Sequence, residues 1–192
     1  MAAEPTARSF APLTRSHLTR LVTMADADNA RFARPGNRSH AWADRRVAVV
    51  LTQGGAQHFL DGTNGVKDLD VWTFYAARPG VPLSCGRYET HADFGRSVHG
   101  RQLYPPGFTD PQYPTWEAYQ GRRVDFLIRD LPVDPGADAE EVTAALRAWL
   151  TAGSRARASR SGAHPTSWHL SHQAMIWLAP AAPGGVIWPA RS

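Results

Sequence analysis

The chain has 192 residues, of which 43% are hydrophobic and 20% are charged. These values suit one ordinary domain, residues 1–192, with its own hydrophobic core, and they argue against wholesale disorder. The formal net charge is +4, and arginine carries almost all of the basicity because Lys67 is the only lysine. Arginine suits an anionic partner such as a nucleotide, a polyphosphate or a nucleic acid, although a GC-rich genome produces the same composition.

The residues that bear on the cellular compartment favour the cytoplasm. The single cysteine, Cys85, excludes an internal disulfide and a thiolate zinc site. The first twenty residues carry charges and prolines where a signal peptide needs an unbroken apolar stretch. No apolar segment reaches the length of a bilayer span. We therefore expect a cytoplasmic protein without a membrane partner.

The first half of the chain predicts a helix followed by a strand, a short helix and a second strand. The N-terminal helix falls within residues 14–34, starts at Thr14 or Ser16 and stops before Pro35-Gly36. Residues 47–52 form a continuous apolar run, which is typical of a strand covered on both faces. A short helix over 56–60 and a glycine-rich turn come next. The second strand covers 71–75 and is rich in β-branched and aromatic residues.

Two carboxylates stand at the start of this second strand. Because strand side chains alternate between faces, Asp68 and Asp70 should point the same way while Leu69 enters the core. Adjacent like charges are costly, and a hard cation such as Mg²⁺ between them would offset that cost. The pair Gly54-Gly55 at a helix start would let backbone N–H groups approach an anion. A simple turn is the alternative interpretation of the glycine region.

These residues resemble a known signature. Gly54-Gly55, twelve intervening residues and Asp68-Leu69-Asp70 resemble the motif of the nucleotidyltransferase superfamily with the DNA polymerase β-like fold, notably of its small bacterial members. Val124-Asp125-Phe126 resembles the third acid of that motif, on a neighbouring strand. The resemblance implies an α+β fold with a small mixed sheet flanked by N-terminal and C-terminal helices.

The resemblance also implies a reaction and a site. Asp68 and Asp70 would hold two Mg²⁺ ions, and Asp125 would join them at the ion nearer the nucleophile. A nucleoside monophosphate would pass from a nucleoside triphosphate to an acceptor, which could be RNA, a protein or a small molecule. The candidate nucleotide-binding residues are Gly54, Gly55, Gln53, Lys67 and Arg96.

Three alternatives compete with this interpretation. The chain could be a non-catalytic nucleotide- or RNA-binding protein of the same fold, for example a partner subunit of a toxin–antitoxin type complex. It could be a glycosyltransferase whose DxD motif binds the metal of a nucleotide sugar, although only 67 residues precede Asp68. Asp125 could instead be a buried acid paired with Arg122 or Arg123.

The second half of the chain predicts less regular structure. The core, residues 45–132, should contain a long loop over 78–121, where prolines, glycines, arginines and aromatic residues follow no sustained period. A strand over 124–128 closes that core. Residues 138–192 should form a C-terminal helical region, with a helix over 140–151 capped by Asp138, a second helix over 166–178 and a short edge strand at 186–188.

Overall fold

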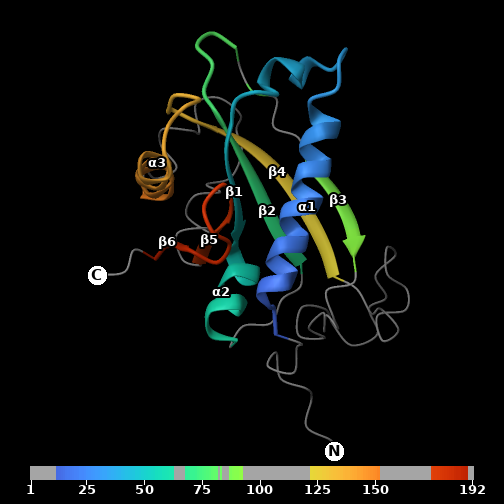
Figure 1. Cartoon of the computed structure of the whole chain (residues 1–192), viewed down its shortest axis with the longest axis vertical. Helices are drawn as coiled ribbons and strands as arrows, with labels where there is room; N and C mark the ends of the chain where they lie inside the picture. Colours follow the sequence, from blue (N-terminus) through green and yellow to red (C-terminus); the bar gives the residue numbers. More distant parts are fainter. Residues whose placement is uncertain are drawn as a thin grey trace, which may run out of the picture.

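The computed structural model describes residues 12–62, 68–81, 83, 87–92, 122–151 and 174–189. Their elements are the helices α1 (Arg15–Phe32), α2 (Gln53–Asp61) and α3 (Ala139–Thr151), the 3-10 helix η1 (Arg38–Trp42), and the strands β1 (Arg46–Thr52), β2 (Asp68–Ala76), β3 (Arg87–Ala92), β4 (Arg122–Leu131), β5 (Ala174–Ala179) and β6 (Val186–Trp188). The strands form one mixed sheet in the order β3-β4-β2-β1-β5-β6 (Figure 1). The described chain is therefore an α+β fold, as expected.

The centre of the sheet is built from β4, β2 and β1. Strands β2 and β4 run parallel, and their pairing continues without a break from Asp68 opposite Arg123 to Ala76 opposite Leu131. The remaining pairs, β1 with β2, β1 with β5, β3 with β4 and β5 with β6, are antiparallel. The parallel pair thus fixes which residues of two strands distant in sequence lie side by side.

Each face of the sheet is covered by its own hydrophobic cluster. One cluster joins Leu18 and Leu21 of α1 and Ala56 of α2 to strand residues such as Leu69 and Val124. The other joins α3 to the opposite face, and its members include Trp72, Phe74, Leu146, Trp149 and Trp177. Figure 1 shows α1 lying along the sheet and α2 at the end where β1 finishes. The two faces are therefore distinguished by which helix covers them.

Helix α1 begins and ends where the sequence predicts. Thr14 is its N-cap: the Thr14 hydroxyl accepts from the backbone N–H of His17, and the His17 side chain accepts from the backbone N–H of Thr14. This reciprocal pair satisfies donors that a helix start otherwise leaves open. Leu18, Leu21 and Ala25 are buried beneath the helix and form its apolar face.

Helix α3 is also confirmed. The Asp138 carboxylate accepts from the backbone N–H groups of Glu140 and Glu141 at 2.9 Å, and Glu141 accepts from the backbone N–H of Asp138. Val142, Leu146 and Trp149 are buried on its inner face. None of the helices in the described residues combines the length and apolarity that crossing a bilayer requires.

Two sequence expectations were wrong. The helix expected over 166–178 is contradicted at its end, because Ala174–Ala179 is the strand β5, and residues 174–188 thus contribute two strands rather than a helical region. The loop expected over 78–121 contains the strand β3, Arg87–Ala92. Both segments are strands because each forms backbone hydrogen bonds with a neighbouring strand. β5 pairs with β1, and β3 pairs with β4.

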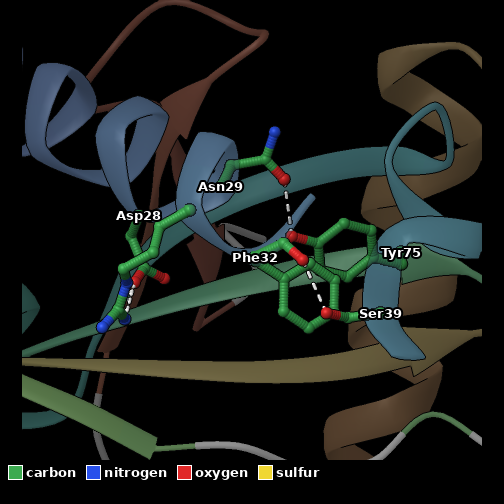
Figure 2. A network of polar contacts seen from close by, with 6 residues as sticks. Asp28, Asn29, Phe32, Ser39 and Tyr75 are labelled. Atoms are coloured by element: carbon green, nitrogen blue, oxygen red, sulfur yellow. Dashed lines mark hydrogen bonds and ion pairs between the residues drawn. The ribbon is translucent and has the colours of Figure 1, made fainter. Parts of the chain in front are cut away.

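A buried tyrosine connects β2 to the end of α1. The Tyr75 hydroxyl donates to Oδ1 of Asn29 at 2.6 Å, and the ring of Phe32 lies 5.1 Å from the tyrosine ring, measured between centroids. Figure 2 shows these side chains together. The Ser39 hydroxyl donates to the carbonyl oxygen of Phe32 at 2.5 Å, which holds η1 to the same helix end. Burial, and secondarily the charge of Asp28, raises the pKa of Tyr75 far above its ordinary value.

This shift predicts an alkaline loss of stability. Because the pKa of Tyr75 is raised on folding, its contribution is complete below the ordinary tyrosine pKa of about 10 and is lost as the pH rises above it. Urea unfolding should therefore show a larger drop in midpoint from about pH 8 to about pH 11 for the wild type than for Tyr75→Phe. At about pH 8 the variant should be less stable by about 1 kcal/mol, the value of one hydrogen bond. Equal drops for the two proteins would contradict the assignment.

Candidate functional site

The predicted orientation of the two acids at the start of β2 is confirmed. Leu69 is fully buried in the cluster beneath α1, whereas Asp68 and Asp70 are partly exposed. Trp72 and Phe74 lie at the next alternate positions of β2 and belong to the cluster beneath α3. By strand alternation, Asp68 and Asp70 therefore lie on the α3 face of the sheet.

The third predicted acid is brought directly beside the second. Asp70 of β2 is the register partner of Asp125 of β4, so their backbones lie on neighbouring strands about 4.8 Å apart. Asp125 belongs to the same face, because Leu127 and Leu131 at alternate positions of β4 contact the cluster beneath α3. Asp68 lies two residues before Asp70, at the start of β2, and about 7 Å from it along the strand. The structure thus groups the acids as a close pair and a neighbour.

The row of paired residues continues on both sides of this acid pair. Thr52, the last residue of β1, is the register partner of Asp70, and its hydroxyl donates to the Asp70 carbonyl oxygen at 3.4 Å. On the other side the backbone of Glu89 in β3 pairs with Asp125. Sequence reasoning did not find either neighbour, because both depend on strand register.

Asp125 differs from the other two acids in its burial. Asp125 is 1% exposed, and it interacts with other groups of the protein. Burying a carboxylate is costly unless charges or hydrogen bonds compensate that cost. Among the described residues no three His, Cys, Asp or Glu side chains are arranged as a complete metal-holding set. As donors, the carboxylates of Asp70 and Asp125 nevertheless suit Mg²⁺, which takes one or two protein carboxylates and completes its shell with water and phosphate.

Helix α2 begins at the same end of the sheet as the acid pair. Gln53 follows Thr52 directly and adopts a left-handed backbone with φ of 58°, which turns the chain from β1 into the helix. Such a conformation is uncommon for a residue other than glycine. The Thr52 side chain makes no capping hydrogen bond to α2, so the first N–H groups of the helix are not satisfied by that side chain. Gln53 forms a β-bridge with Ala174, and Gly54 and Gly55 follow it in the first turn of α2, directly after Thr52, the register partner of Asp70.

Gly55 has a packing role that the sequence did not indicate. It lies within α2 rather than in a turn, and a Cβ atom there would lie 3.1 Å from Cδ1 of Leu51 and 3.2 Å from Cδ2 of Leu69. Glycine thus lets the first turn of α2 approach β1 and β2 closely. The simple-turn interpretation of the glycine region is wrong, because Gln53–Asp61 is helical and Gly62 ends that helix in the left-handed conformation.

A cation on the same face was also missed. Arg129 lies on β4 at an alternate position from Asp125, with its guanidinium 4.6 Å from the centre of the Trp72 ring. It also donates to the carbonyl oxygen of Ile128 at 2.7 Å. Its place beside Trp72 could have been suggested only by the β2–β4 register. The predicted nucleotide contacts Lys67 and Arg96 lie outside the described residues.

The comparisons with known proteins gave no relative. Scans of protein-family models, of curated proteins and of solved structures returned no match to this chain.

The close contact at Gly55 predicts that a larger side chain at this position destabilises the fold. Gly55→Val should lower the free energy of unfolding by about 1–3 kcal/mol, because the added side chain would meet Leu51 and Leu69 in a packed interface. Gly136→Val is the matched control, since nothing lies within 4 Å of a Cβ built at Gly136. That control should change stability by less than about 0.5 kcal/mol. Urea unfolding measures both, and equal effects would refute the packing role.

Proposed function

We propose that this protein is a Mg²⁺-dependent nucleotidyltransferase of the DNA polymerase β-like type, which transfers a nucleoside monophosphate from a nucleoside triphosphate to an acceptor. The observation that carries the proposal is the in-register pairing of Asp70 with Asp125 on parallel strands, beside the start of α2. It agrees with the sequence motif, in which two acids on one strand meet a third acid on its neighbour. The absence of any matching relative leaves the proposal to rest on this geometry and on that motif.

The roles of the residues follow from their positions. Asp68 and Asp70, on β2, would hold the Mg²⁺ ion that meets the triphosphate, and Asp70 and Asp125, paired across β2 and β4, would hold a second ion on the acceptor side. Bound Mg²⁺ would supply a positive charge for the phosphates and would acidify the acceptor hydroxyl.

The protein would also position the phosphates and the acceptor hydroxyl for the reaction. The backbone N–H groups of Gly54 and Gly55 would donate to the terminal phosphates, favoured by the helix dipole. The acceptor oxygen would then bond to the α-phosphorus as the bond to the β-phosphate oxygen breaks and pyrophosphate leaves. We assign Asp125 to the acceptor side, where its carboxylate would take the hydroxyl proton.

The second candidate is a nucleotide- or RNA-binding protein of this fold without transfer activity. The burial of Asp125 favours it, because a carboxylate held in the sheet can serve structure alone. The two candidates differ in the fate of the nucleotide. With α-labelled triphosphates and an RNA or protein extract, label on an acceptor indicates transfer, and recovery of only unchanged nucleotide indicates binding without catalysis.

The first test asks whether nucleotide binding depends on the acids of β2. Calorimetric titration with ATP, GTP, CTP and UTP should detect binding of at least one nucleotide that requires Mg²⁺. Asp70→Asn and the double variant Asp68→Asn/Asp70→Asn should weaken that binding by at least about tenfold, because a metal ligand is removed. Asp44→Asn, an exposed acid before β1, should bind like the wild type. Unchanged binding by the double variant would refute the metal role.

Transfer activity makes a second, separate test. Asp125→Asn should retain most of the triphosphate affinity and lose transfer by at least about a hundredfold, because it removes the group on the acceptor side. Because Asp125 is buried, a circular dichroism spectrum and an unfolding curve must show that the variant is still folded. A folded Asp125→Asn protein with full transfer would show that the acceptor-side assignment is wrong.

A further inference from the structure

A surface hollow of about 910 Å³ lies at the opposite end of β2 and β4 from the acid pair. The hollow is lined by the segment from Ala77 to Val81, which follows β2, and by residues between the end of β4 and the first turn of α3. Ala77 follows Asp70 by seven residues, which is about 23 Å of extended strand. The hollow is therefore separate from the proposed nucleotide site, although the same two strands support both.

The walls of this hollow are largely aliphatic. Pro79, Val81, Pro132, Val133 and Ala137 line it, and they come from both the β2 and the β4 sides. Val81 is 39% exposed and is the large hydrophobic side chain most open to solvent in the described residues. An aliphatic wall of this kind favours a ligand with its own hydrocarbon segment.

Carboxylates are spaced around these walls. Asp130 comes from the end of β4, Asp134 from the connection to α3, and Glu141 from the first turn of α3. None of these three acids forms an ion pair with another described residue. Glu141 uses Oε2 to accept the backbone N–H of Asp138, which fixes its direction at the helix start.

One guanidinium also lines the hollow. Arg78 donates to the carbonyl oxygen of Ala41 at 3.2 Å, so a backbone group of η1 holds its side chain. Among the described residues that line the hollow, three carboxylates stand against this one cation, and the neighbouring Arg45 guanidinium donates to the carbonyl oxygen of Ala77, so the lining itself carries an excess of negative charge. A ligand that complements it must therefore be cationic as well as partly aliphatic.

We propose that this hollow binds a small aliphatic polyamine, a molecule whose ammonium groups are joined by short methylene chains. Separate ammonium groups would each meet a carboxylate of Asp130, Asp134 or Glu141, and the methylene chain would lie against the wall formed by Val81 and Val133. Volumes of about 300–1,000 Å³ are typical of small-molecule sites, so the hollow has room for such a chain. The proposal does not depend on nucleotidyl transfer.

Calorimetry with the full chain tests it, with spermidine as the probe. Butylamine, with one ammonium group, and 1,4-butanediol, with none, are the ligand controls. Spermidine should bind at least about tenfold more tightly than butylamine, because a second charge-assisted contact is made. Asp130→Asn, Asp134→Asn and Glu141→Gln should each weaken spermidine binding by about tenfold. Glutamine keeps the capping contact at position 141, so that variant removes charge without removing the cap.

The control for general surface charge is Asp44→Asn, an exposed acid outside the hollow, which should leave spermidine affinity unchanged. The proposal would be overturned if spermidine produced no heat of binding at millimolar concentration, or if Asp44→Asn weakened binding as much as Asp134→Asn. Equal affinity for spermidine and butanediol would overturn it as well. None of these three results would bear on the test of Mg²⁺-dependent nucleotide binding.

Discussion

The unbroken parallel pairing of β2 with β4 is the constraint on which the candidate site depends. Its register sets Asp70 opposite Asp125, although 55 positions separate them in the chain. A shift of one residue would turn Asp125 to the α1 face and would place Val124 beside Asp70. The register is held because Leu69, Val71, Val124 and Phe126 fill the cluster beneath α1. Hydrophobic burial on one face thus fixes the position of charge on the other.

The two ends of these strands have different surroundings. At the Asp70 end, the chain leaves β1 at Thr52, the register partner of Asp70, and passes through the left-handed Gln53 into the first turn of α2. At the other end, the aliphatic hollow carries Asp130 and Asp134. Between them, Trp72 packs against Trp149 of α3, with ring centroids 5.8 Å apart. One rigid strand pair therefore supports two chemically distinct surfaces.

Much of the fold could be predicted from local pattern, and the part that could not depends on distant neighbours. Helix α1 and helix α3 carry caps and a clear apolar period. Residues 174–179 read Ala-Met-Ile-Trp-Leu-Ala, an apolar run without alternation, so periodicity could not separate a buried strand from a helix. The shared direction of Asp68 and Asp70 followed from strand alternation alone. Their register with Asp125, and the packing role of Gly55, required the tertiary structure.

The most direct test of the acid pair is a crystal structure of the protein with Mn²⁺ and a non-hydrolysable nucleoside triphosphate. Manganese scatters anomalously and takes the oxygen ligands of Mg²⁺. If Asp70 and Asp125 hold the metal, we expect an anomalous peak for an ion bound by carboxylate oxygens of both residues, with the triphosphate extending towards Gly54. A peak elsewhere, with the Asp125 carboxylate bound only by protein groups, would contradict it.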